Sequence, residues 1–147
     1  MNADTDPSPA DTAIPPGFEP VVRGGAFFAH LAPVYRRIDG DARVLAVRIG
    51  AQHGNEHGNA HGGMLVTLAD GALHDNLLRG RAPGARIVTI NLCADFLSPA
   101  RVGDWLEAHV SIQRQGRQLG VADCLLRVGE RRVLRASATF MEPPARP

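Results

Sequence analysis

The stretch HGNEHGNAHGG, residues 53–63, places a histidine before a glycine at every fourth position, a pattern that could bind a metal ion. Histidines at these intervals converge only on a helix, and glycine at every fourth position disfavours a helix there. No cysteine lies near, and the spacing is not that of a zinc site. The residues therefore favour a loop over a metal site.

The last two glycines, Gly62 and Gly63, precede an apolar run with helical spacing, which predicts that a long helix starts here. Backbone N–H groups in the first turn of a helix have no partner within it, and glycine leaves them open to approach. The helix dipole adds partial positive charge at that end. Such a terminus suits the negative charge that develops on a carbonyl oxygen under attack by water. The alternative is that both glycines only shape a tight start of the helix.

Asp70 is the second residue that could do chemistry, as a base, and the alternative is an ordinary solvated acid on an exposed helix face. Eight residues at a rise of about 1.5 Å separate it from Gly62 by roughly 12 Å. A base and an oxyanion donor must both act on one carbonyl, each within about 3 Å. If both interpretations hold, two antiparallel helices across a twofold axis must supply the two groups, which requires at least an isologous dimer.

Hydrophobic periodicity predicts the elements that position these groups. Residues 27–31 predict a short helix, and residues 34–49 predict two strands around a turn at 39–41. Residues 62–79 predict the long helix, which ends at Gly80. Four segments with alternating apolar residues follow, at 88–96, 106–113, 122–128 and 134–140. The order β-β-α-β-β-β-β predicts an α+β fold, with an antiparallel sheet covered by one helix.

The 147 residues with 44% hydrophobic content fit one domain with its own core. We expect a disordered proline-rich leader at 1–20, the domain at 21–142 and a tail at 143–147. The net charge of +1 recruits neither nucleic acid nor an anionic membrane. No apolar run approaches the ~20 residues of a membrane span, and no secretory signal is present. The expectation is a cytoplasmic protein, with Cys93 and Cys124 as buried reduced thiols.

The motif NEHGNAHGGMLVTLAD, from Asn55 to Asp70, resembles the hotdog-fold acyl-CoA thioesterases, in the branch that includes the phenylacetate-pathway thioesterases. That family has an asparagine six residues before His-Gly-Gly and an aspartate seven after it. The segment TINLCADFLSPARVGD, residues 89–104, is similar to the family's following strand. The resemblance covers about residues 20–142. It implies the hotdog fold, an antiparallel sheet wrapped around one long central helix.

The resemblance implies hydrolysis of a short- or medium-chain or aromatic acyl-CoA to the free acid and CoA. The N–H of Gly62 would polarise the thioester carbonyl, and Asp70 from the other protomer would act as general base or nucleophile. Asn55 would position the attacking water or the carbonyl. His61 would shape the loop or contact the thioester, and Thr89 would assist the water.

Gly63 and His74 would contact the substrate. The resemblance implies that His74 and Asp75 line the acyl pocket where relatives have smaller or apolar residues, which argues against a purely aliphatic long chain. The CoA phosphates would lie near basic side chains, although each of these could be an ordinary surface arginine. The candidates are Arg114, Arg117 and Arg135. The resemblance implies a homodimer or a dimer of dimers and no metal or other cofactor, since CoA is part of the substrate.

Two other functions stay open. A hotdog enoyl-CoA hydratase or dehydratase would pair a histidine with an acid at a different spacing. A non-catalytic acyl-CoA-binding module would be expected to lose the acid, yet Asp70 is present.

Overall fold

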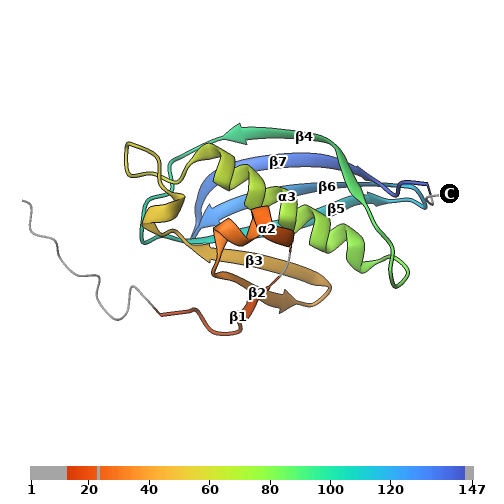
Figure 1. Cartoon of the computed structure of the whole chain (residues 1–147), viewed down its shortest axis with the longest axis horizontal. Helices are drawn as coiled ribbons and strands as arrows, with labels where there is room; N and C mark the ends of the chain where they lie inside the picture. The colour runs from red at the N-terminus through yellow and green to blue at the C-terminus, as the bar shows by residue number, and fades with distance from the viewer. Residues whose placement is uncertain (1–12, 23, 145–147) are drawn as a thin grey trace, which may run out of the picture.

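The computed structural model describes residues 13–22 and 24–144, which form one antiparallel sheet around a long helix (Figure 1). The helix, α3, spans Gly62–Arg79. The seven strands follow the order β1-β2-β3-β5-β6-β7-β4 across the sheet. They are β1 (Glu19–Val21), β2 (Val34–Asp39), β3 (Ala42–Arg48), β4 (Val88–Phe96), β5 (Trp105–Gln115), β6 (Leu119–Val128) and β7 (Arg131–Met141). Short helical segments complete the described fold: α2 (Gly25–Phe28), η1 (Ala29–Leu31) and η2 (Ala51–His53).

This architecture confirms the predicted α+β hotdog arrangement. The long helix has the predicted bounds, and β2 and β3 form the predicted hairpin around Gly40, whose φ of 56° suits glycine. Strands β4 to β7 are antiparallel, as their alternation predicts. The short helix predicted at 27–31 is divided between α2 and η1. β1 is an addition of only three residues, paired with β2, and is too short to show a period.

One face of α3 packs against the inner face of the sheet. The buried helix residues recur at helical spacing, at Leu65, Leu68, Ala69, Ala72, Leu73 and Leu77. They meet alternate strand residues, among them Leu45, Leu106 and Leu126, in one continuous core. This contact fixes which side of α3 faces away from the sheet, and Asp70, which is only half-buried, lies outside the buried stripe.

The predicted boundary of the leader at residue 20 falls too late. Residues 1–12 lie outside the described residues, but from residue 13 the chain follows the outer face of the sheet. Phe18 is buried there with Val44 and Ala46. Its ring also meets that of Trp105 edge to face at 5.2 Å. The proline-rich composition predicted disorder, and this one aromatic residue orders the segment around it. In the predicted tail, Pro143 and Pro144 are described and residues 145–147 are not.

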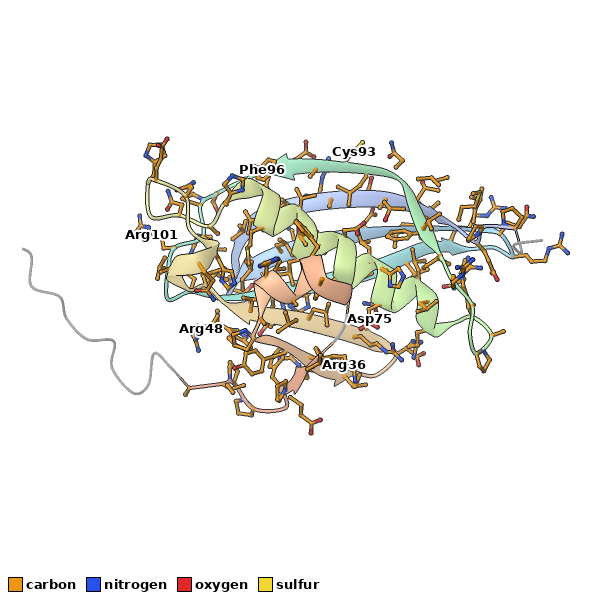
Figure 2. All side chains as sticks on the ribbon, in the orientation of Figure 1. Arg36, Arg48, Asp75, Cys93, Phe96 and Arg101 are labelled. Carbon is orange, nitrogen blue, oxygen red and sulfur yellow. The ribbon has the colours of Figure 1, made fainter. Side chains whose placement is uncertain are left out.

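The C-terminal half of α3 is bound to β3 by polar contacts. The Asn76 side chain accepts a hydrogen bond from the N–H of Arg43 at 2.9 Å and donates to its carbonyl at 2.8 Å. β3 pairs with β5 only from Leu45 onward, so Asn76 supplies the partner that the sheet lacks at Arg43. Beside it, the Arg43 guanidinium pairs with the buried Asp75 at 2.8 Å. Figure 2 labels Asp75 on the side of α3 nearest β3.

The loop between β3 and α3 is held by a buried histidine. The Nδ1 atom of His53 accepts a hydrogen bond from the N–H of Gly50 at 3.0 Å. The opposite nitrogen, Nε2, lies 3.2 Å from the carbonyl of Leu31 and donates to it in the neutral tautomer. Burial lowers the pKa of His53 below its ordinary value of 6.5. A proton on Nδ1 would face the Gly50 N–H, donor against donor, so the fold requires the neutral ring.

We expect Asn76→Leu to lower the free energy of unfolding by about 1–3 kcal/mol, because it leaves two partly buried main-chain groups of Arg43 without partners. Urea unfolding followed by circular dichroism measures the loss. Gln113→Leu, on an exposed strand position, is the control and should change stability by less than about 0.5 kcal/mol. Equal losses for the two variants would contradict the role given to Asn76.

The stability that neutral His53 contributes should be complete above its unfolded pKa of about 6.5 and should fall as the pH drops below it, because only the unfolded chain takes up the proton readily. Melting temperatures between about pH 8 and pH 5 measure this slope. His53→Gln should be less stable than the wild type near pH 8 and should show a flatter acid dependence. His57→Gln, an exposed change in the same loop, should keep the wild-type slope. An unchanged slope in His53→Gln would refute the assignment.

Candidate active site

The two glycines that begin α3 have different hydrogen-bond states. His61 is the N-cap residue, and its Nδ1 atom accepts a hydrogen bond from the N–H of Gly63 at 2.9 Å. The predicted substrate contact Gly63 therefore has its N–H occupied within the chain. The N–H of Gly62 binds no acceptor among the described residues. His61 thus fixes the first turn, and Gly62 offers the amide that an external oxygen can reach.

Phe96, at the end of β4, covers one side of Gly62. A side chain at position 62 would place its Cβ only 3.1 Å from the Phe96 Cε1 atom. The ring is still 58% exposed, and Figure 2 labels it beside the start of α3. Because residue 62 is glycine, the Phe96 ring can lie close to the Gly62 amide and cover one side of it. Nothing in the sequence marks Phe96 as a site residue, because alternation along a strand does not say which loop the end of the strand meets.

Asn55 organises the loop before the helix. Its Oδ1 atom accepts hydrogen bonds from the N–H groups of His57 at 2.9 Å and Asn59 at 3.2 Å. Gly58 closes this turn with a φ of 74°, and its N–H donates to the Asn55 carbonyl at 3.1 Å. The second His-Gly unit is therefore a tight turn. Within the described chain no acceptor binds the Nδ2 group of Asn55, which can donate to a bound molecule.

Asp70 and Thr89, both predicted as site residues, are in contact. The Thr89 hydroxyl donates to the Asp70 Oδ1 atom at 2.7 Å, from the edge strand β4 to the half-buried acid on α3. Because its hydrogen is directed at the carboxylate, the Thr89 hydroxyl orients the Asp70 side chain. The second carboxylate oxygen, Oδ2, accepts no hydrogen bond from the described residues and can accept one from water.

Two pockets meet at His74, one helical turn after Asp70. The smaller holds about 240 Å³ and is lined by Gly24, Phe28, Asp70, Gly71 and His74. The larger holds about 650 Å³ and runs along the C-terminal half of α3, lined by His74, Leu78, Ala85, Arg86, Ile87, Val88, Pro143 and Pro144. The structure thus places His74, which was predicted to contact the substrate, where the two pockets meet. The expectation that Asp75 lines the same space is wrong, since it is buried against Arg43 of β3.

Two of the three predicted phosphate-binding arginines, Arg114 and Arg117, lie near the C-terminal end of α3. Arg117, in the turn between β5 and β6, lines a pocket that shares Pro143 and Pro144 with the 650 Å³ pocket. Arg114 is exposed on β5 nearby, whereas Arg135 pairs with Asp95 at 2.7 Å and lines a different pocket. Arg86 is an addition that sequence reasoning missed, because nothing in the sequence places its loop beside α3. Arg86, Arg114 and Arg117 form no ion pairs with described residues.

The structure separates the two thiols. Cys124 is buried, which raises its pKa to about 12. Cys93 is exposed, so the prediction that both are buried is wrong for Cys93. The neighbouring residues Leu92 and Ala94 pack on the core, and the strand therefore turns Cys93 outward, as labelled in Figure 2.

Within residues 13–22 and 24–144, no group of three or more histidine, cysteine, aspartate or glutamate side chains could hold a metal ion. No described helix has the length and apolar character of a membrane span.

Comparison with known proteins places these features in context. The profile of the thioesterase superfamily matches residues 57–135, which include Gly62, Asp70 and Thr89. The chain is 40% identical over 131 residues to PA0474 of Pseudomonas aeruginosa, whose name gives esterase as a proposed activity. This match covers 88% of the chain and 98% of that relative.

Solved structures match over most of the fold. The PaaI protein of the E. coli phenylacetic acid degradation operon is 26% identical, with a TM-score of 0.72, over 82% of this chain and 87% of that protein. The BH2602 protein of Bacillus halodurans, solved with CoA, is 25% identical, with a TM-score of 0.76, over 85% of this chain and 83% of that protein.

Proposed function

Because the chain belongs to the thioesterase superfamily and has the hotdog fold, we propose that it hydrolyses acyl-CoA in sites shared between two protomers. The observation that carries this proposal is the Asp70 carboxylate, held by Thr89 and open to a pocket. The Gly62 amide at the start of the same helix, with no acceptor in the described chain, supplies the complementary group.

The edge strand β4 supports a dimer. It is nine residues long and pairs only with β7, so its other edge has no partner in the described chain. Three large apolar side chains of this strand, Val88, Ile90 and Phe96, are exposed. A long apolar edge of this kind is a template for a second strand. Twofold pairing of two β4 edges would continue the sheet and bring the two α3 helices side by side and antiparallel.

In this dimer, the N–H of Gly62 of the partner subunit would donate to the thioester carbonyl oxygen near Asp70. Asp70, as general base, would take a proton from a water whose oxygen forms a bond to the carbonyl carbon. Collapse of the tetrahedral intermediate breaks the carbon–sulfur bond, and the proton passes to the sulfur of CoA. As nucleophile, Asp70 would instead form a mixed anhydride that water then cleaves. Single turnover in ¹⁸O-water separates the routes, because only the anhydride can leave label in the Asp70 carboxylate.

The remaining site residues would position these groups. The Nδ2 group of Asn55 would donate to the water or to the carbonyl, and His61 would aim the first helical turn through its bond to Gly63. Besides water and the substrate the reaction needs only the chain's own groups, so we propose no cofactor. We also retain the predicted cytoplasmic location and the choice between a dimer and a dimer of dimers.

We assign the two pockets at His74 to the two ends of the substrate. The 650 Å³ pocket would take the pantetheine arm of CoA, which leads its phosphates toward Arg86, Arg117 and Arg114. The CoA in the BH2602 structure supports this class of ligand. The acyl group would then occupy the 240 Å³ pocket beside Asp70, whose size suits a short or medium chain or one aromatic ring.

We expect Asp70→Asn to lower kcat by about 10²–10⁴-fold, because the amide cannot accept the proton of water. Release of free thiol, followed with dithiobis-nitrobenzoate over a panel of acyl-CoA thioesters, measures the rate. Asp41→Asn, an exposed acid paired with Arg79, is the control and should retain wild-type activity. Equal rates for Asp70→Asn and the wild type would refute the mechanism. Tight acyl-CoA binding without turnover by the wild type would favour a binding module.

A shared site should recover activity from two inactive variants. Gly62 is the first helical residue, and His61 has φ −64° and ψ 136°, so Gly62→Pro fits the backbone and removes the N–H. Gly62→Ala meets Phe96 similarly but keeps the N–H, and should be the more active variant. An unfolded and refolded equal mixture of Gly62→Pro with Asp70→Asn should show about one quarter of wild-type activity, since random pairing restores that fraction of sites. A mixture as inactive as its components would place both groups in one protomer.

A further inference from the structure

The short helix α2 lies across α3 (Figure 1), and its last residue, Phe28, lines the same pocket as Asp70. The ring of Phe28 is 8% exposed and lies between Gly24 and Gly71. A Cβ at Gly71 would lie 2.3 Å from its Cε2 atom, and one at Gly24 would lie 2.6 Å from its Cγ atom. No other residue type fits either position while the ring stays in place.

The position of Gly71 makes this contact more than ordinary packing. Glycine inside a helix is less favourable than alanine, and the buried stripe of α3 uses alanine at positions 69 and 72, where it meets the sheet. At 71 even a methyl group would displace Phe28. α3 therefore has glycine, which is unfavourable inside a helix, at position 71, where the Phe28 ring lies against the helix backbone next to Asp70.

Phe28 forms a wall of the proposed acyl pocket. The 240 Å³ pocket holds Asp70 and His74 on α3, and the ring of Phe28 opposite them. On the other side of α2 lies a second pocket of about 370 Å³, which Phe27, Leu31, Met64 and Thr67 help to line. Thr67 and Asp70 are three residues apart and so neighbour each other on the surface of α3. α2 therefore contributes to both pockets along α3, with Phe28 lining the pocket beside Asp70 and Phe27 lining the other.

We propose that Phe28 sets the length of the acyl group, so that the enzyme selects short acyl chains and short arylacyl groups. This rests on the proposed thioesterase function and on the acyl group occupying the pocket beside Asp70. At roughly 30 Å³ for each water-sized group, 240 Å³ accommodates about eight such groups. A longer chain would meet the Phe28 ring, which is held between the backbones of Gly24 and Gly71.

Variants of Phe28 in the full-length protein test this inference in both directions. Phe28→Ala and the milder Phe28→Leu open the wall toward the second pocket, and Phe28→Trp narrows the first. kcat/KM is measured over a saturated series from acetyl-CoA to dodecanoyl-CoA. The ratio of dodecanoyl-CoA to butyryl-CoA should rise about tenfold in the Ala and Leu variants, and the optimum should shorten in Phe28→Trp.

Phe27→Ala is the matched control, since this neighbouring ring is 73% exposed and does not line the acid's pocket. It should keep the wild-type profile. An unchanged profile in all Phe28 variants, or a wild type that prefers dodecanoyl-CoA, would overturn the proposal for Phe28. A wild type that hydrolyses no acyl-CoA would instead overturn the proposed function, so the two failures are distinguishable.

A double-mutant cycle tests the packing of the Phe28 ring on Gly71 independently of catalysis. Gly71→Ala should lower the melting temperature of the wild type, because the methyl group displaces Phe28. The same change in a Phe28→Ala background should lower it less or raise it, since alanine is the better helix former. Equal losses in both backgrounds would show that the ring does not rest on Gly71 and would remove the basis of the inference.

Discussion

The rigid spacing of α3 is the constraint on which the proposed site depends. Gly62 and Asp70 lie on one continuous helix, and eight residues of helix separate them by roughly 12 Å. No rotation of a side chain closes that distance to the reach of one carbonyl. Hydrolysis with both groups therefore needs a second copy of the helix, antiparallel to the first, and the exposed edge of β4 offers the place for it. In the proposed mechanism, catalysis and assembly are thus one requirement.

A site divided between two helices needs each helix to be held firmly. The N-cap residue His61 fixes the start of α3. Thr89 of β4 binds its middle through Asp70, and further along the helix Asn76 binds the main chain of Arg43 in β3. The last two contacts come from strands at different places in the sheet, so the helix is tied to both sides of the fold. The apolar stripe alone would fix how closely α3 packs on the sheet, while these polar contacts fix the rotation of the helix about its axis and its position along the strands.

The sequence predicted those parts of the molecule that local pattern controls. Alternation placed the strands β4 to β7, and the apolar spacing placed α3 with its predicted bounds. The same patterns assigned Asp70 to the long helix and Thr89 to the strand that follows it, and the structure joins the two residues by a hydrogen bond. The residues it missed act through contacts between distant segments. Phe96 and Arg86 could not be found by period, since their role depends on which loop or pocket they meet.

The same limit explains the glycines. From sequence, Gly62 suggests an open helix start and Gly71 suggests only a weak point within a helix. In the structure each lies beneath an aromatic ring, Phe96 over the proposed oxyanion donor and Phe28 beside the proposed base. In both cases a ring from another segment fills the space that a side chain at the glycine would take. The ring therefore packs directly on the backbone beside a proposed catalytic group. Because these walls come from α2 and from the end of β4, the shape of the pocket can change without altering Asp70, Thr89 or the amide of Gly62.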